Sequence, residues 1–543
     1  MANRNCAPLR GLFPWLSVIL LGCTGHLGDP EKPVDDDPTS AEELGVGPMA
    51  MRRLSVYEYD RTVLDLLGDD RAVGASLLPE DNRTPFDNDF ETQTPSNVLV
   101  VAVETLAGDV ATALVADPAR RDPLIGCTPT GPNDEACMET FVRRFGLRAW
   151  RRPMSDAEVM DFVSLGVTFS QEQGDFFAGV ELVLRAFLQS AEFLYRIEIG
   201  TAVEGQNGLY RLSGFEIGSR MSYLIWGSTP SEELLESAEA GELDSVEGRR
   251  SAAKAMLSDP RAHTQVERFH SMWLGFEKMP LGPELTGPMR VETAAIIERI
   301  VFDEPQSWLE LFQTTETFVD DSLAAHYGLK GPGGASPSWV DMGGSGRQGI
   351  LSLGAFLSAA SNPNDTSPTK RGKLIRERLL CDPVGAPPPD APADNPPDPS
   401  LGACKIDQYL ANQAVGESCR GCHQPMDAIG FGLENYDMAG QFRSHDDNAP
   451  SCTIDGQGEL VGAGVFKGPA ELSELLVRED IDACAAEYLL RYASGRALTS
   501  ADEALSERVG ESFRSSDHRF DELIVAIVSS EAFGYRTDMK VEE

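Results

Sequence analysis

One short stretch of this 543-residue chain combines residue types that could do chemistry. Cys419, Cys422 and His423 form its one Cys-x-x-Cys-His motif. In such a motif the two thiols can add across the vinyl groups of a haem, and the adjacent histidine can reach the iron from one side. Two residues between the cysteines let a single turn present both sulfurs to one edge of the macrocycle. The motif therefore predicts covalently bound haem c, with His423 as the first protein ligand of the iron.

Other interpretations of the motif are a redox-active dithiol, half of a zinc site, a structural disulfide or a chance match. A thioredoxin-like dithiol would be expected within a βαβ unit, and a zinc site needs a second pair of ligands at a suitable spacing. The sequence around residue 420 offers neither. A disulfide or a chance match therefore stays open as the main alternative to haem.

The composition predicts a globular and strongly acidic protein. Hydrophobic residues make up 41% of the chain, and 86 acidic against 46 basic residues give a formal charge of −40. This charge repels nucleic acid and anionic lipid headgroups, so neither is an expected partner. A basic or neutral redox partner protein would be attracted. The length predicts three or four compact units of roughly 150 residues each.

The N-terminal residues indicate export. Arg4 and Arg10 give the chain a positively charged start. They precede an apolar run at 12–21 that is too short to span a bilayer. Gly22-Cys23 follows, as in a bacterial lipobox, so residues 1–22 are predicted to be a lipoprotein signal peptide and Cys23 the lipidated residue. An ordinary cleaved signal or a short membrane anchor is the alternative. We expect an envelope lipoprotein, in the outer membrane or facing the periplasm, without a transmembrane helix in the mature chain.

The remaining cysteines fit an oxidising compartment. Besides Cys6, Cys23 and the motif pair, an even number remains, which suggests disulfides. These residues are Cys127, Cys137, Cys381, Cys404, Cys452 and Cys484. Cys127 and Cys137 are the expected pair, because they lie close in sequence across a predicted turn; the other pairings cannot be deduced from the sequence.

Repeated helix-start signals predict a mainly α fold, a multi-helical array with a cytochrome c-like CxxCH segment and a small β or loop excursion. Capping boxes begin at Ser55, Ser155 and Ser213, each with glutamate three residues later. Thr229 opens a fourth, with proline at the expected first helical position. Residues 180–199 are apolar nearly all round, which predicts one buried helix. Its aromatic residues are expected to pack in the core rather than line a haem cavity: Phe187, Phe193 and Tyr195.

The predicted organisation has seven segments. After the signal peptide at 1–22 come a disordered acidic tether at 23–49, helical domains at 50–125, 126–200 and 201–330, a segment at 331–465 with a proline-rich strap and the haem-binding motif, and a C-terminal helical domain at 466–543. Within 331–465 we expect an exposed loop at 331–347, the extended strap at 383–399 and a small hairpin between about 443 and 465.

Several stretches, taken in order, resemble the planctomycete-type cytochrome c proteins, a family of exported bacterial proteins built from a serial array of domains of unknown function. The matching stretches are 52–68, 148–154, 190–196, 323–329, 366–372, 419–437 and 490–496. The resemblance implies a helical, secreted protein that bears c-type haem. It implies little about a substrate.

The second protein ligand of the iron would decide the function. Met438 and His445 are weak candidates, and Met342 and His326 are conceivable. Met426 lies too close to His423 to approach the opposite side of the ring. A methionine or histidine ligand would give an electron carrier, whereas an open position would admit peroxide or oxygen.

Other polar residues near the motif have expected supporting roles. Arg371 and Arg443 could pair with the haem propionates, because arginine makes bidentate contacts to carboxylates; ordinary salt bridges are the alternative. The polar residues that follow the motif are expected to fix its loop through backbone hydrogen bonds rather than to act in catalysis. They are Asp427, Glu434, Asn435 and Asp437.

Three functions are consistent with these observations. The first is an envelope c-type cytochrome that uses one covalent haem for electron transfer. The second is a haem enzyme of peroxidase or oxidase type acting on an extracellular substrate, which the chain's length favours because a small carrier needs only about 100 residues. The third is a non-catalytic envelope scaffold or binding module.

Overall fold

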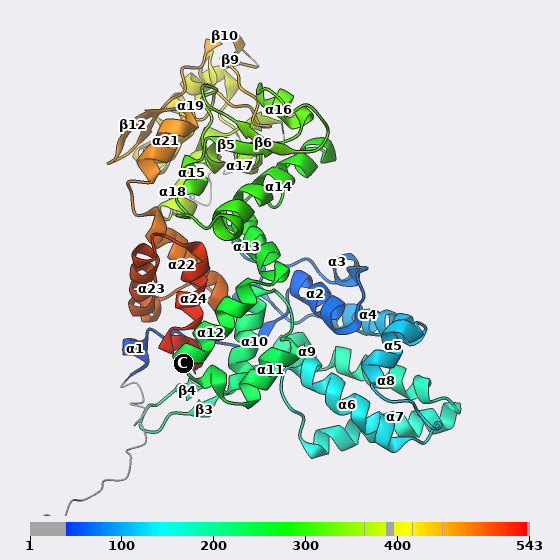
Figure 1. Ribbon diagram of the computed structural model, residues 1–543. Coiled ribbons are helices and arrows are strands. Elements are labelled where there is room, and N and C mark those ends of the chain that lie inside the picture. The colour runs from blue at the N-terminus through cyan, green and yellow to red at the C-terminus, as the bar shows by residue number, and fades with distance from the viewer. Residues whose placement is uncertain (1–39, 363, 387–395, 415, 448, 540–543) are drawn as a thin grey trace, which may run out of the picture. The chain divides into compact units, whose positions relative to one another are not determined.

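The helix-start signals correctly predicted a mainly α-helical protein. The structure, a computed structural model, describes residues 40–362, 364–386, 396–414, 416–447 and 449–539. There the helices alternate with small sheets of two or three strands (Figure 1). The expected signal peptide, the lipid site at Cys23 and much of the expected tether lie outside the described residues, as does the middle of the expected strap.

The helices fall into four groups along the chain. The first contains α1 (Ala41–Leu44), α2 (Val56–Leu67), α3 (Val73–Leu77), α4 (Asn97–Val115), α5 (Pro118–Ile125), α6 (Glu135–Trp150), α7 (Asp156–Gln173), α8 (Phe176–Gln189) and α9 (Ala191–Leu194). The second contains α10 (Gly214–Ile225), α11 (Glu232–Glu239), α12 (Val246–Leu257), α13 (Pro260–Trp273), α14 (Pro283–Glu298), α15 (Glu310–Gln313), α16 (Asp321–Tyr327) and α17 (Gly354–Ala359). The third contains α18 (Pro368–Leu379), α19 (Lys405–Gln413) and α20 (Glu417–Phe431), and the fourth α21 (Gly468–Leu476), α22 (Ile481–Ser494), α23 (Glu503–Ser515) and α24 (Phe520–Val528).

The strands are short and all pair antiparallel. The two-stranded sheets join β1 (Arg52–Arg53) to β2 (Tyr195–Arg196), β5 (Glu316–Val319) to β6 (Ser338–Asp341), β7 (Ser361–Asn362) to β8 (Asp365–Thr366), β9 (His445–Asp446) to β10 (Ala449–Thr453), and β11 (Gln457–Leu460) to β12 (Gly464–Lys467). In the three-stranded sheet, β4 (Leu209–Arg211) lies between β3 (Thr201–Ala202) and β13 (Tyr535–Thr537). The excursion expected at 443–465 thus contains β9, β10, β11 and the start of β12.

Three of the four predicted helix starts have the expected caps. The hydroxyls of Ser55, Ser155 and Ser213 accept the backbone N–H three residues on, and the glutamate at that position accepts the N–H of the serine. The fourth prediction was wrong: α11 is capped by Ser231, whose hydroxyl accepts from the Leu234 N–H. Thr229 is buried, and its hydroxyl donates to the Arg148 carbonyl instead.

Two hydrophobic cores organise the described chain. Residues from 54 to 193, with Tyr223, form one, and residues drawn mainly from 203–535 form the other. Phe187 and Phe193 lie fully buried in the first core, so their expected packing role is confirmed. The second core combines segments that the sequence analysis divided at residues 330 and 465.

The single buried helix expected at 180–199 is divided in the structure. Helix α8 ends at Gln189, and Ser190 adopts an extended conformation. The Ser190 hydroxyl caps α9 by accepting from the Phe193 N–H, and the Trp150 indole donates to the same oxygen at 2.8 Å. The chain then enters β2, which pairs with β1. Serine competes for backbone hydrogen bonds in this way, which an apolar pattern alone does not reveal.

Helix α4 is the one helix, in the part of the chain that the structure describes, that is long and apolar enough to cross a membrane by length and composition. From the sequence, no transmembrane helix is expected in the mature chain. One of its faces, which includes Leu106, Val110 and Leu114, is buried in the first core. Val98 and Val101 remain exposed near its N-terminus. Such a pattern is also typical of an amphipathic core helix.

One segment expected to be disordered is packed against the core, and another forms largely the expected loop. Residues 40–49 were assigned to the tether, but Leu44 and Val46 are buried and the Arg508 guanidinium donates to the carbonyls of Glu43 and Leu44. Most of residues 331–347 form the expected exposed loop, which is interrupted by β6, and this strand pairs with β5. The two apolar residues of the first segment were too few to reveal their buried positions from the sequence.

Candidate functional site

Helix α20 presents the three residues of the motif on one face. Cys419, Cys422 and His423 lie within it at positions i, i+3 and i+4, which are neighbours on a helix surface. Cys419 is exposed, Cys422 is intermediate, and the His423 side chain is 31% exposed. Local helical geometry is therefore sufficient to bring both thiols and the imidazole together.

The motif thiols are free, whereas the other described cysteines are paired. Disulfides join Cys127 to Cys137, Cys381 to Cys484, and Cys404 to Cys452. The first is the pair expected from the sequence. The other two span 103 and 48 residues and could not be deduced. Free thiols at Cys419 and Cys422 are what covalent attachment of haem requires, and they disagree with the structural-disulfide interpretation.

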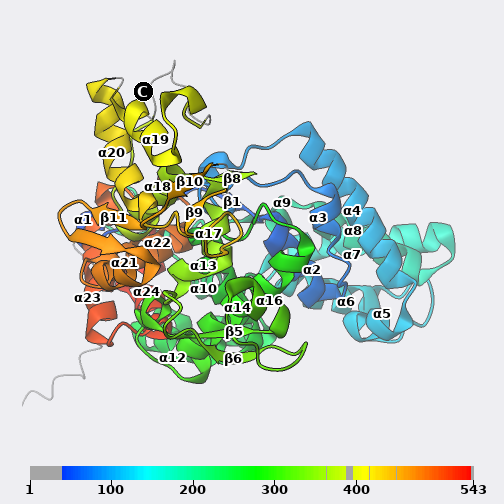
Figure 2. The same ribbon diagram turned by 90° about the horizontal axis from the view of Figure 1, so that it is seen from above.

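Helices α18 and α20 pack against each other at two glycines, and α19 lies beside α20 (Figure 2). A Cβ atom at Gly372 in α18 would lie within 2.9 Å of three backbone atoms of Met426. A Cβ at Gly430 in α20 would lie within 2.5 Å of three backbone atoms of Pro368. Because both close contacts involve backbone, no rotation of a side chain could relieve them. The stretch at 366–372 is thus the packing partner of the motif helix.

Asp427 is fully buried one helical turn after His423. The Thr369 hydroxyl donates to its Oδ1 at 2.5 Å, and the Gln413 amide donates to its Oδ2 at 2.7 Å. The same Oδ2 lies 3.5 Å from His423 Nδ1, an ion-pair distance that is longer than a normal hydrogen bond. This carboxylate raises the pKa of His423, because it favours the protonated ring.

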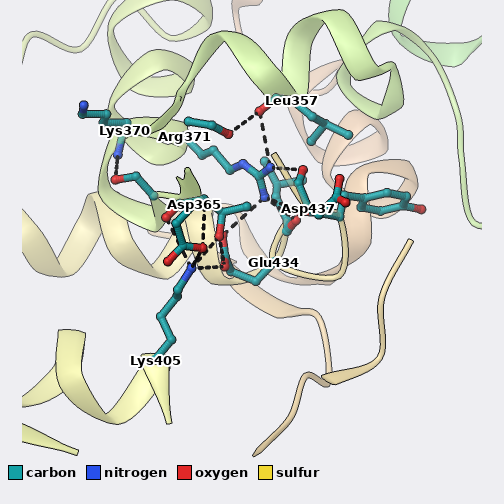
Figure 3. A network of polar contacts seen from close by, with 12 residues as sticks. Leu357, Asp365, Lys370, Arg371, Lys405, Glu434 and Asp437 are labelled. Carbon is teal, nitrogen blue, oxygen red and sulfur yellow. Dashed lines mark hydrogen bonds and ion pairs between the residues drawn. The ribbon is translucent and has the colours of Figure 1, made fainter. Parts of the chain in front are cut away.

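Arg371 lies at the centre of a second buried network (Figure 3). Its two terminal nitrogens donate to the carbonyls of Leu433 and Tyr436 at 2.8 Å, of Asp437 at 2.9 Å and of Leu357 at 3.3 Å. They also contact Glu434 Oε1 at 3.3 Å. These contacts hold the chain that leaves the C-terminal end of α20.

Glu434 is the acidic partner of three cationic side chains. Its Oε2 lies 3.0 Å from Arg443 and 3.6 Å from Lys405, and its Oε1 contacts Arg371. Both arginines were candidates for pairing with haem propionates, with ordinary salt bridges as the alternative. In the described structure they contact Glu434 and nearby carbonyls. The physical reason is that a buried guanidinium needs several acceptors, and the turn after α20 supplies them.

The polar residues after the motif fix its loop in two ways. The Asn435 amide donates to the carbonyls of Arg443 and Ile454, and Asp437 Oδ1 accepts from the N–H groups of Ala439 and Gln441. These backbone contacts agree with the prediction. Asp427 and Glu434 instead contact side chains. The partners of Asp427 lie on α18 and α19. The partners of Glu434 come from segments both before and after the motif in the sequence.

The candidates for a second iron ligand occupy different surroundings. His326 Nε2 is 2.9 Å from the Ala439 carbonyl, and Met342 is fully buried in the second core. His445 Nδ1 is 2.9 Å from the Ser444 hydroxyl. Met438 is partly buried in the turn after α20. His326 thus lies in α16, His445 lies in β9, and Met438 follows the motif helix.

The donor set of the motif fits haem c. Two free thiols and an imidazole share one helix face, and His423 Nδ1 is turned toward Asp427, which leaves Nε2 as the nitrogen for a metal. Among the described residues, no cluster of three or more His, Cys, Asp or Glu side chains is arranged to hold a bare metal ion. This arrangement offers no support for a zinc site.

Sequence reasoning missed Thr369 and Gln413, and did not connect Asp427 to His423. The spacing of His423 and Asp427, four residues apart, becomes a signal only once this segment is known to be a helix. Thr369 and Gln413 gave none, because their contacts with Asp427 depend on how α18 and α19 pack against α20.

Five family models match the chain in series. In sequence order they describe proteins of unknown function named DUF1587 (residues 52–116), DUF1595 (137–198), DUF1592 (212–329), DUF1588 (347–446) and DUF1585 (464–533). The DUF1588 model, also named PSCyt3, covers both α18 and α20. No curated protein and no solved structure matched significantly. The serial order of these five domains across residues 52–533 shows that the chain belongs to the planctomycete-type cytochrome c family.

Proposed function

We propose that this protein is a c-type cytochrome of the bacterial cell envelope that carries one covalent haem and transfers electrons. One observation carries the proposal: Cys419, Cys422 and His423 share one face of α20, and both thiols are free while the other six described cysteines form disulfides. The haem would supply reversible one-electron chemistry at its iron.

The roles of the protein's own residues follow from the site. Cys419 and Cys422 would hold the haem covalently, and His423 would bind its iron through Nε2. The contacts between α18 and α20 would keep these side chains in place. The formal charge of −40 would attract a basic or neutral redox partner protein and disfavour nucleic acid.

Location in the envelope is part of the same proposal. The lipobox-like end of the apolar run at Cys23 supports lipid attachment, in the outer membrane or facing the periplasm. The three disulfides support an oxidising compartment. Metabolic labelling with a fatty acid, compared between the wild-type chain and Cys23→Ala, tests the anchor.

An optical spectrum tests the function. The protein is matured in a host that attaches c-type haem, and spectra are recorded oxidised, reduced, and reduced with carbon monoxide. We expect a haem band that acidified acetone does not extract, and its loss in the double variant Cys419→Ala/Cys422→Ala. An extractable or absent band in the wild-type protein would refute covalent attachment.

The same spectra separate the electron carrier from the haem enzyme. Low-spin bands that carbon monoxide leaves unchanged would mean that both axial positions of the iron are filled, as in an electron carrier. High-spin bands that shift with carbon monoxide would mean an open position. The second result would refute electron transfer as the primary function and favour the peroxidase or oxidase alternative.

A further inference from the structure

The nitrogen of His423 that faces the protein has no hydrogen-bond partner. Its Nδ1 is buried, yet no donor or acceptor lies within normal hydrogen-bonding geometry. The ion-pair contact with Asp427 Oδ2, at 3.5 Å, is the polar contact made by this atom in the described structure. Burying a polar nitrogen without a hydrogen-bond partner is unfavourable, so this arrangement calls for an explanation.

Asp427 is held in place from two other helices. Its side chain is fully buried, and its two oxygens accept from Thr369 of α18 and Gln413 of α19. A buried carboxylate is unfavourable unless such donors stabilise it. Its Oδ2 therefore has a fixed position 3.5 Å from Nδ1 of the imidazole, one helical turn further along α20.

We propose that Asp427 is a positioning residue for His423, accepting its Nδ1–H when Nε2 binds haem iron. This inference rests on the proposed function. The contact selects the tautomer that leaves Nε2 free and restricts rotation of the ring. A ligating histidine generally donates its second N–H to a carboxylate or carbonyl, and a 3.5 Å contact can shorten when the other nitrogen is engaged.

A carboxylate at this position also affects the iron. Accepting the Nδ1–H makes the imidazole more electron-donating, and this stabilises the oxidised iron over the reduced iron. Asp427 should therefore lower the midpoint potential and strengthen the iron–histidine bond. A purely structural role, tying α18 and α19 to α20, would change neither quantity once the protein is folded and loaded.

The experiment compares Asp427→Asn with Thr369→Val in the haem-loaded full chain. Asp427→Asn removes the charge behind the ring, whereas Thr369→Val removes a hydrogen bond to Oδ1 and keeps the charge. We expect Asp427→Asn to raise the midpoint potential, measured by redox titration of the optical spectrum. Thr369→Val should stay close to the wild-type potential while losing thermal stability. Equal potentials in wild type and Asp427→Asn would overturn the inference.

A measurement on the unloaded wild-type chain needs no variant and no haem. Nitrogen-15 NMR of His423, at a pH above its pKa, reports which nitrogen carries the proton. We expect the Nδ1–H tautomer; a dominant Nε2–H tautomer would overturn the inference even if Asp427→Asn did not fold. If the wild-type protein never acquires covalent haem, the proposed function fails, and this NMR result still decides the pairing of Asp427 with His423.

Discussion

Replacing Gly372 by alanine should loosen the motif helix specifically. The new Cβ would lie within 2.9 Å of three backbone atoms of Met426, a distance that real Cβ atoms essentially never show. The nearest of these atoms, the Met426 carbonyl oxygen, would lie at 1.8 Å, so helices α18 and α20 would have to move apart by about 1.5 Å to restore normal contact. Overpacking of this kind costs about 3 kcal/mol at the upper end of its usual range. The better helix propensity of alanine returns about 1 kcal/mol, so the expected net loss is about 2 kcal/mol.

Hydrogen exchange measures this loss of stability separately for helix α20. A destabilisation of about 2 kcal/mol corresponds to about 30-fold faster exchange of those α20 amides that exchange by opening away from α18. Gly510→Ala is the matched control, because Gly510 lies inside α23 and its Cβ would meet a single flexible arginine atom at 3.9 Å. The control should leave α20 unchanged and slow exchange in α23. Unchanged or slower exchange of α20 in Gly372→Ala would refute the backbone-contact argument.

Two further predictions concern stability. Burial raises the pKa of Glu292 to about 7, above the model-peptide value near 4.5, so the folded state holds this proton more tightly than the unfolded state. Its contribution to the free energy of unfolding is therefore complete below about pH 4.5 and is lost as the pH rises through 7, by about 3 kcal/mol. Urea unfolding between pH 5 and 8 should show a flatter pH dependence of stability in Glu292→Gln than in the wild type. An equal pH dependence in both proteins would contradict the raised pKa of Glu292. Replacing Cys381 and Cys484 by serine opens a loop of 103 residues and should cost about 5 kcal/mol, against about 3 kcal/mol for Cys127 and Cys137, which are 10 apart. Thermal unfolding of the two double variants checks the order, and a larger loss from the short loop would contradict it.

Features that depend on neighbouring residues were predictable. The capping boxes at Ser55, Ser155 and Ser213 are correct because a cap involves residues three apart. The short spacing of Cys419, Cys422 and His423 predicted that one turn brings them together, and the structure shows that this turn belongs to helix α20. The disulfide between residues 127 and 137 closes across one local turn.

Predictions failed where a distant contact competes with a local signal. Thr229 has the residue type of a helix cap, but its hydroxyl bonds to the Arg148 carbonyl, 81 residues earlier. Residues 40–49 are acidic, but Leu44 and Val46 are buried in a core formed mostly by later residues.

The amino-acid sequence alone determines that the fold is mainly helical and that two thiols and an imidazole lie close together, because both properties arise within a few residues of chain. Contacts between distant segments determine which residues hold the carboxylate next to that imidazole. Thr369 and Gln413 reach Asp427 from 58 residues and 14 residues away along the chain. Such pairings depend on which helices come into contact, and short-range sequence patterns carry no record of that choice. The imidazole of His423 is thus specified locally, whereas the carboxylate behind it is fixed by the folded protein.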